Sequence, residues 1–264
     1  MPFTFAHPLY AAPLKLLKPK YVSLTGIILG SMSPDFEYFI MLEPYQSIGH
    51  TSIGLLLQAF PLSILFAFIF HFIIKTSVAS HIPSLYNLDA KVQSIVRLHH
   101  WKLNNIHSWI VFLASVAAGF YSHVLLDAFT HQSGYFVSRF IWLQAELAGI
   151  PVYKILQHSL SLIGLTAQAI IILVIINRVK VVSASINSSI SETSYSMKVK
   201  SKDKVLYWCT VIVVMMLTMS GKLLLSTSTN YIGMLVVSSI SGCFLGVLAA
   251  SIIYKLRSAI SNNK

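Results

Sequence analysis

Charged residues are scarce in this sequence of 264 residues, at 10%, against roughly a quarter in soluble globular proteins. Asp and Glu together number only 8, whereas Lys and Arg number 19. Hydrophobic residues make up 55% of the chain, and its mean hydropathy is +0.72. This composition excludes an ordinary water-soluble globule and is typical of a membrane protein.

Cysteine and the common catalytic motifs are also scarce or absent. Cys209 and Cys243 lie in apolar stretches far from any His, which argues against a disulfide framework and a zinc–thiolate site. The sequence has no glycine-rich phosphate loop, dinucleotide fingerprint, GxSxG turn or HExxH helix, so nucleotide-driven pumps and serine hydrolases are not indicated. Its basic residues are spread between apolar segments, which argues against a nucleic-acid-binding protein.

Long apolar stretches are what the chain has instead. Five stretches without acidic or basic residues approach the roughly 20 residues that cross a bilayer. A sixth apolar stretch contains Pro34, Asp35 and Glu37, and therefore predicts a half-span or an interfacial helix, or one arm of a short N-terminal hairpin. The sequence thus predicts an all-α integral membrane helical bundle with five spans plus an N-terminal half-span or hairpin. The expected spans are 51–74, 106–126, 155–177, 205–221 and 231–254, and the sixth stretch is 21–42.

Composition divides the chain into three regions. Residues 1–178 hold nearly all the polar residues of interest, 179–204 form a Ser-rich stretch with a basic end, and 205–264 form an apolar helix pair. We expect the second region to be a mobile cytoplasmic loop. The loops on its side of the five spans hold thirteen Lys and Arg residues and the opposite loops hold six, so the positive-inside rule makes the first side cytoplasmic.

This topology gathers histidines and acids at the non-cytoplasmic ends of the spans. Because hydropathy and basic residues alone fixed the topology, this convergence supports a functional site there independently. We interpret the group as a set of candidate metal ligands: His7, Asp35, His50, His123, Asp127, His131 and His158.

The most specific element is the stretch around Asp127. His123, Asp127 and His131 are spaced four residues apart, which predicts one stripe on a helix. Imidazole and carboxylate groups on one face are how helical bundles hold divalent metals. The alternative is a His–Asp pair that only packs the bundle, but ionisable groups within a membrane favour a functional site.

The other candidates are weaker when taken alone. Asp35 follows Pro34 in an expected turn, so its carboxylate either points back into the cluster or caps the next helix. His7 and His50 have the alternative of being interfacial anchors. His158 lies between Gln157 and Ser159, which suit hydrogen bonds between helices.

The chain resembles a bacterial family of multi-pass membrane proteins of unknown function in five ordered segments, MPFTFAHP, GSMSPDFEYF, GHTSIGLLL, GFYSHVLLDAFTH and YKILQHSLSLIG. It more distantly resembles the LexA-regulated type of membrane-bound metal-dependent hydrolase, and through it the bundles of zinc-dependent phospholipase C and P1-type nuclease. The resemblance covers residues 1–170. It implies as ligands His7, Asp35, His50, His123 and Asp127, with His131 as a sixth. Leu162 stands four residues after His158 where those hydrolases carry Glu, which implies one or two metal ions rather than three.

The resemblance implies a metal-dependent hydrolase in a bacterial cytoplasmic (inner) membrane, acting on a phosphoester of a lipid or lipid-linked substrate. Its divalent metal would be zinc, with manganese or iron as alternatives, and Asp35 or Asp127 would accept a proton from the attacking water. Membrane lipids are the expected partners, and no nucleic acid is expected. The remaining alternatives are a metal or proton translocator and a bundle with a structural metal site. The sequence does not indicate an oligomeric state.

Overall fold

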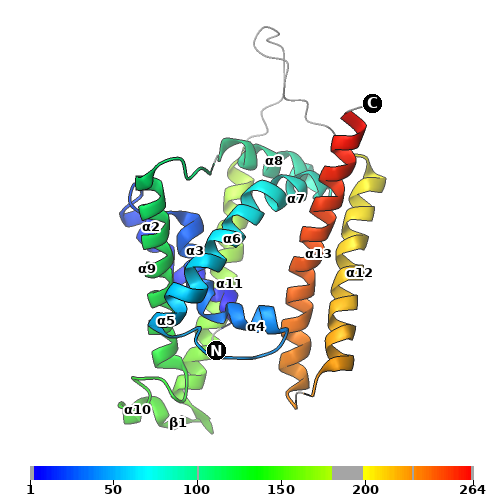
Figure 1. Cartoon of the computed structure of the whole chain (residues 1–264). Coiled ribbons are helices and arrows are strands. Elements are labelled where there is room, and N and C mark those ends of the chain that lie inside the picture. The colour runs from blue at the N-terminus through cyan, green and yellow to red at the C-terminus, as the bar shows by residue number, and fades with distance from the viewer. Residues whose placement is uncertain (1–2, 100, 180–198, 228, 263–264) are drawn as a thin grey trace. The chain divides into compact units, whose positions relative to one another are not determined.

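The computed structural model describes residues 3–99, 101–179, 199–227 and 229–262, and these residues form an all-α fold (Figure 1). Strands occur among them only as a small antiparallel hairpin, in which Glu146 pairs with Pro151. In chain order the elements are η1 Thr4–Ala6, α1 His7–Ala11, α2 Pro13–Leu17, α3 Leu24–Met32, η2 Ser33–Asp35, α4 Phe36–Met41, α5 Ser52–Gly54, η3 Leu55–Ala59, α6 Phe60–Phe68, η4 Ile69–Ile74, α7 Lys75–His81, η5 Leu85–Asn87, α8 Leu88–Leu98, α9 Ile106–Thr130, α10 Ile141–Gln144, β1 Glu146–Leu147, β2 Ile150–Pro151, α11 Val152–Arg178, α12 Ser201–Leu225 and α13 Tyr231–Asn262.

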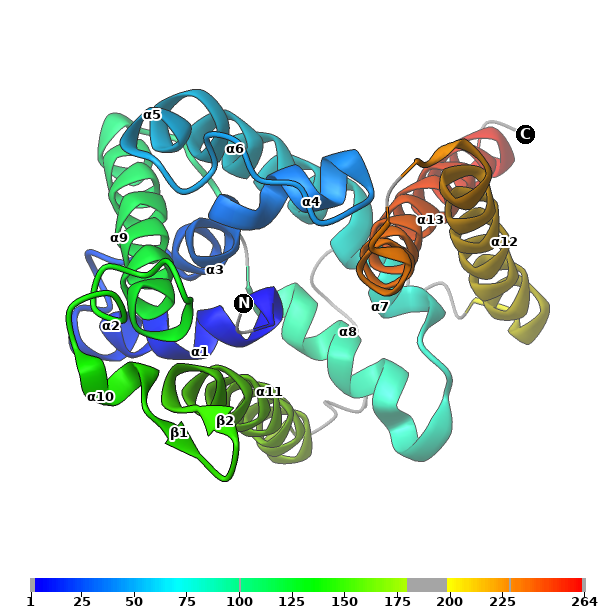
Figure 2. The ribbon, with the colours of Figure 1, turned by 90° about the horizontal axis from the view of Figure 1, so that it is seen from below.

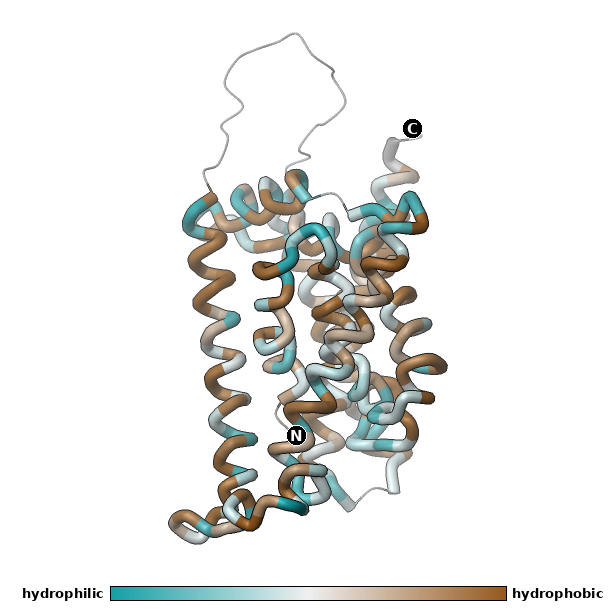
Figure 3. The backbone as a smooth tube through the Cα atoms, turned by 90° about the vertical axis from the view of Figure 1, so that its left-hand side faces the viewer, coloured by the Kyte–Doolittle hydropathy of each residue, from teal (hydrophilic) through white to brown (hydrophobic). Residues whose placement is uncertain are grey.

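Five helices among the described residues are long and apolar enough to cross a membrane, which confirms the predicted spans. Figure 3 shows apolar residues along most of their lengths. Every helix contains its predicted stretch almost entirely and is longer. The five are Ser52–His81, Ile106–Thr130, Val152–Arg178, Ser201–Leu225 and Tyr231–Ile260.

Two boundaries differ from the prediction in ways that matter. Helix α9 ends at Thr130, so His131 adopts an extended conformation at its C-terminal end and is not the third residue of a helical stripe. Helix α12 begins at Ser201, so the last residues of the expected loop are helical. The rest of that loop, 180–198, lies outside the described residues, and the division of the chain at 178 and 204 stays a prediction.

The stretch 21–42 is a broken helix. Helix α3 ends at Met32, a short 3-10 turn follows at η2, and α4 continues from Phe36. Pro34 lies inside that turn, but Ser33 before it keeps helical backbone angles, with φ at −66° and ψ at −28°, so the proline does not extend the residue before it. The predicted N-terminal hairpin is also present, because the chain turns back after α2 and α3 packs against α1.

The chain forms two compact units. One contains residues 1–67 and 102–172, and the other contains 68–101 and 173–264. We call them the N-terminal unit and the C-terminal unit after the ends of the chain that they hold. All seven candidate ligands belong to the N-terminal unit.

Helices α3 and α9 pack at backbone distance in the N-terminal unit (Figure 2). A Cβ atom at Gly30 would lie 2.1 Å from the carbonyl oxygen of Val116, and one at Gly119 would lie 2.4 Å from that of Ile27. Only glycine permits such an approach, which is a common way for membrane helices to associate. The close contact brings the end of α3 beside the turn of α9 that carries His123.

Candidate metal centre

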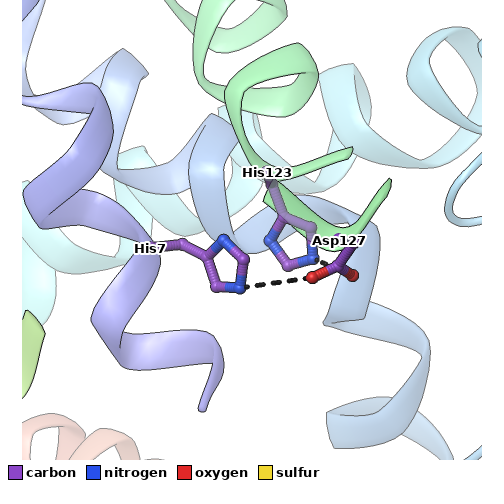
Figure 4. Close-up of side chains that lie close together, drawn as sticks. All are labelled: His7, His123 and Asp127. Carbon is purple, nitrogen blue, oxygen red and sulfur yellow. Dashed lines mark ion pairs between the residues drawn. The ribbon is translucent and has the colours of Figure 1, made fainter. Parts of the chain in front are cut away.

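The carboxylate of Asp127, one turn after His123 on α9, is the middle of a buried His/Asp cluster. Its Oδ2 lies 3.2 Å from Nε2 of His123 and 3.3 Å from Nε2 of His50. Its Oδ1 lies 3.7 Å from Nε2 of His7 and 3.5 Å from Nδ1 of His131. Figure 4 shows the rings of His7 and His123 beside this carboxylate, with His7 coming from α1. One carboxylate therefore faces four histidines from three segments: α1, the loop before α5, and α9 with the residue that caps its C-terminal end.

Asp35 is the second acid of the cluster. Its Oδ1 lies 3.6 Å from Nε2 of His50, and its Oδ2 lies 3.7 Å from Nε2 of His123. The hydroxyl of Thr4 donates a 2.6 Å hydrogen bond to Oδ2. Asp35 occupies the N-cap position of α4 but makes no capping hydrogen bond with its side chain. Of the two alternatives for this residue, the carboxylate pointing into the cluster is the one observed.

A hydrogen bond at Nδ1 fixes the orientation of the His123 ring. Nδ1 lies 2.7 Å from the carbonyl oxygen of Ser31 at the end of α3. Because a carbonyl only accepts, Nδ1 carries the hydrogen and donates it, and in the neutral ring this leaves Nε2 as a lone-pair donor facing both acids. Metal-bound histidines in proteins are typically held through the far nitrogen in this way.

The N-terminal segment that carries His7 is held by α11. Gln168 donates through Nε2 to the carbonyl oxygens of Phe5 and Ala6, at 2.8 Å and 3.3 Å. Tyr10 donates a 2.6 Å hydrogen bond to the carbonyl oxygen of Leu160. The ring of His7 then stacks on that of His123, with centroids 3.7 Å apart. Helix α11 thus positions one histidine of the cluster.

Glu37 fixes the loop before His50. Its carboxylate accepts hydrogen bonds from the hydroxyl and the backbone N–H of Ser47, both at 2.6 Å, and from the N–H groups of Ile48 and Gly49, both at 3.0 Å. Burial raises the pKa of this carboxyl, but these bonds outweigh burial and hold the pKa below its usual value. Glu37 is therefore a satisfied acid, and it also positions the loop that carries His50.

The cluster is deeply buried and short of hydrogen bonds. The side chains of Asp35 and His123 are 0% exposed. Within the described residues, Oδ1 of Asp35, Oδ1 of Asp127 and Nε2 of His123 have no well-aligned hydrogen-bond partner. Burial raises the pKa of Asp35, and His123 and Thr4 counteract this only in part. Unpaired buried oxygens are costly unless a proton or cation compensates them.

The donor set fits a divalent metal. Two overlapping groups, His7–His123–Asp127 and Asp35–His50–His123, each have ligand atoms within 4.8 Å of one another. Imidazole nitrogen and carboxylate oxygen are the donors that zinc takes in four-coordinate sites, and neither acid pairs with Lys or Arg within the described residues. Two carboxylates would balance the charge of one divalent ion.

Two candidates stand apart from these groups. His131 lies at the rim, where its Nδ1 also lies 3.1 Å from the backbone carbonyl of Asp127, so only its Nε2 remains for a ligand. The structure does not bring His158 into either group among the described residues, and its side chain is exposed on α11.

Sequence reasoning missed Thr4, the carbonyl oxygen of Ser31 and Gln168 as supports of the cluster. Their contacts join segments about 30 to 160 residues apart in the chain. Thr4 could have been noticed because it lies three residues before His7, one helical turn away. The other two carry no local signal.

Residues 1–252 match a family model described as "Domain of unknown function (DUF4184)". No curated protein and no solved structure matches the chain. The more distant resemblance to metal-dependent hydrolases therefore stays a prediction.

Proposed function

The chain belongs to the DUF4184 family, whose name assigns no activity, and we propose that it is a membrane-embedded, metal-dependent hydrolase of phosphoesters. One observation carries the proposal: two acids and three histidines meet in a buried centre in which both acids have an oxygen without a hydrogen-bond partner among the described residues. In a purely structural His–Asp pair, buried polar atoms are normally all hydrogen-bonded. Two buried acids side by side are costly unless a proton or a cation compensates their charge, and a divalent metal ion would do so for both.

His7, Asp35, His50, His123 and Asp127 would hold one or two divalent ions, and zinc suits these nitrogen and oxygen donors best. Such an ion lowers the pKa of a bound water and polarises a phosphoryl oxygen. Asp35 or Asp127 would accept the proton that the water gives up, through the oxygen that it leaves unpaired among the described residues. Ser31 would keep the tautomer of His123 fixed throughout.

The substrate would enter from the side of the cluster that is partly open. His131 is 28% exposed, His50 is 16% exposed and Asp127 is 10% exposed, whereas His123 and Asp35 are sealed. The positive-inside rule assigns this end of the spans to the non-cytoplasmic face. A centre at that depth favours a phosphoester on a lipid or a lipid-linked molecule over a freely soluble one.

Metal content tests the first part of the proposal. We expect the full-length protein, purified in detergent without chelators, to carry about one or two zinc ions per chain by elemental analysis. His123→Ala and Asp127→Asn should lose the metal, whereas His158→Ala, which removes an exposed histidine outside the cluster, should retain it. Wild-type protein that stays metal-free after zinc supplementation would refute the proposal.

Hydrolysis tests the second part. The metal-loaded protein in vesicles should release phosphate from phosphatidic acid or headgroup from phosphatidylglycerol, and chelation or Asp127→Asn should abolish the release. Bound metal without hydrolysis of either lipid would contradict the hydrolase and favour a structural site. Zinc uptake into proteoliposomes would favour a translocator instead.

A further inference from the structure

The segment between α9 and α11, residues 132–151, is a small folded lobe. Val137, Leu143 and Tyr153, the last from α11, form its buried core, and Phe129, Phe136 and Val152 pack around them. Gln144 donates a 2.8 Å hydrogen bond through Nε2 to the carbonyl oxygen of Val137. The lobe contains α10 and the β1–β2 hairpin, labelled at one end of α9 in Figure 1.

This lobe exposes large apolar side chains although it has its own core. Ile141 is 83% exposed, Trp142 is 57% exposed and Leu147 is 65% exposed. Phe140, Tyr135 and Ile150 are also exposed. The lobe has only two charged residues, Arg139 and Glu146. Adjacent exposed apolar residues on a folded element indicate a binding surface rather than a water-facing one.

The position of the lobe indicates what covers this surface. Its two ends continue directly into α9, which ends at Thr130, and α11, which begins at Val152, and both helices are long and apolar enough to cross a membrane. A segment of about 20 residues fixed at both ends to spans is held close to the membrane surface, where the lipid headgroups lie. Trp and Tyr are enriched at that level because their rings are apolar at one end and polar at the other.

Arg139 gives the lobe a cationic group beside its apolar side chains. The guanidinium carbon lies 3.6 Å from the centroid of the Tyr135 ring, and Nη1 donates to the carbonyl oxygen of Tyr135. The side chain is exposed, and no ion pair with an acid holds it among the described residues. A cation next to exposed Phe, Ile and Trp matches the anionic phosphate and the acyl chains of a lipid.

The lobe is also connected to the metal centre. The backbone N–H of Phe136 donates a 3.1 Å hydrogen bond to the carbonyl oxygen of Ala128, the residue after Asp127. The ring of Phe136 stacks on Phe129 at 4.0 Å between centroids and contacts Phe140 at 5.9 Å. Phe140 in turn lies 6.4 Å from Trp142. A series of aromatic rings thus runs from the last turn of α9 to the exposed surface.

We propose that residues 132–151 form a lipid-docking lobe, which inserts Phe140, Ile141 and Trp142 into the membrane interface and binds a lipid phosphate through Arg139. The lobe would hold a lipid headgroup beside the open side of the His/Asp cluster. Lipid docking requires the membrane spans and does not require hydrolysis. A failure of the lobe to enter the membrane is therefore distinguishable from a failure of the proposed activity.

Site-directed spin labelling tests the insertion. Cys209 and Cys243 are first replaced by Ser, since both are exposed, and single cysteines are then introduced as Ile141→Cys and, as the control, Gln132→Cys at an exposed polar position of the same lobe. The labelled full-length protein is placed in lipid nanodiscs that contain phosphatidylglycerol. Collisions of the nitroxide with membrane-soluble oxygen and with a water-soluble nickel chelate report its depth.

We expect the label at position 141 to collide several-fold less with the nickel chelate, and more with oxygen, than the label at position 132. Equal access of the chelate to both labels would overturn the proposal. Leu147→Cys supplies a second apolar position if the first variant does not fold, and the same result is expected there. Arg139→Gln should leave the depth of the label at 141 unchanged. It should also remove the difference that we expect in the label's mobility between phosphatidylglycerol and a phosphate-free glycolipid. If the wild-type protein shows no such difference, lipid phosphate is not the ligand of Arg139.

Discussion

The polar groups of the two units are satisfied in opposite ways. In the C-terminal unit, Lys204 at the start of α12 makes three hydrogen bonds, to Asp89 and the carbonyl oxygen of Ile82 at 2.8 Å each and to Ser84 at 2.7 Å. One positive charge there meets one negative charge. In the N-terminal unit, two buried carboxylates face histidines and the hydroxyl of Thr4, without a Lys or Arg, and each leaves an oxygen unpaired among the described residues.

This difference separates a polar contact whose donors are all satisfied from one whose carboxylates keep oxygens without a hydrogen-bond partner among the described residues. The ammonium of Lys204 has three N–H groups and three acceptors, so nothing further can bind there. The Asp35–Asp127 cluster has spare lone pairs and a net negative charge when its histidines are neutral. The candidate site is therefore identified better by acids whose oxygens lack hydrogen-bond partners than by the burial of acids alone.

The largest effect on stability is expected where the backbones of α3 and α9 pack closely, because this contact positions residues of the His/Asp cluster. Gly30→Ala should destabilise the N-terminal unit by about 1–3 kcal/mol or more, because the new Cβ would lie 2.1 Å from the backbone oxygen of Val116. The variant should also lose metal, since Ser31 follows directly. Gly221→Ala is the matched control in α12, where no atom lies within 4 Å of the new Cβ, and it should be neutral or stabilising by up to about 1 kcal/mol. Thermal unfolding in detergent measures both, and similar losses of stability in the two variants would contradict the packing argument.

A smaller effect is expected from the residue that positions His50. Glu37→Gln replaces one acceptor oxygen by an amide facing N–H donors from residues 47–49, so the loop should loosen. Zinc affinity should fall about 10-fold to 100-fold, as is typical when an outer partner of a metal ligand is lost. Competition with a chromophoric chelator measures it, and the visible spectrum of the cobalt-substituted protein should change as well. Glu146→Gln, on the exposed β1 strand, should change neither quantity. An unchanged spectrum in Glu37→Gln would show that the loop does not depend on this carboxylate.

The smallest effect is expected in the C-terminal unit. Lys204→Met should lower the melting temperature by about 2–4 °C and leave the metal content unchanged. Burial raises the pKa of Asp89, but hydrogen bonds from Lys204 and Ser84 outweigh it and hold the pKa below its usual value. A lowered folded-state pKa stabilises the protein above the unfolded pKa of about 4, and this stabilisation is lost as the pH falls below it.

Wild-type protein should therefore lose more stability than Lys204→Met between about pH 5 and pH 3. Lys202→Met, at an exposed position of the same helix turn, is the control and should follow the wild type. Parallel pH profiles for wild type and Lys204→Met would show that this ion pair does not contribute.

The spans and the core of the site could be predicted because their signals are local. Apolar length alone indicates five helices, and the spacing of His123 and Asp127 places both on one face of α9. His131 could not be placed in the same way, because the helix ends one residue earlier, where Gly134 donates its N–H to the carbonyl oxygen of His131. The roles of Glu37 and Gln168 depend on segments that meet only in the folded chain. For the same reason, nothing in the sequence indicates that residues 68–101 pack with the C-terminal helices.

The hydrogen bonds between Gln168 of α11 and the N-terminal segment also affect the order in which the protein can fold during synthesis. His7 is among the first residues made, whereas Gln168, which holds its neighbours Phe5 and Ala6, is made more than half a chain later. The nascent protein therefore cannot complete its centre until its third long helix has entered the membrane. Because domains generally fold as units while synthesis continues, the centre would be complete before α12 and α13 are inserted. A chain truncated before Gln168 would lack the hydrogen bonds that hold Phe5 and Ala6, next to His7.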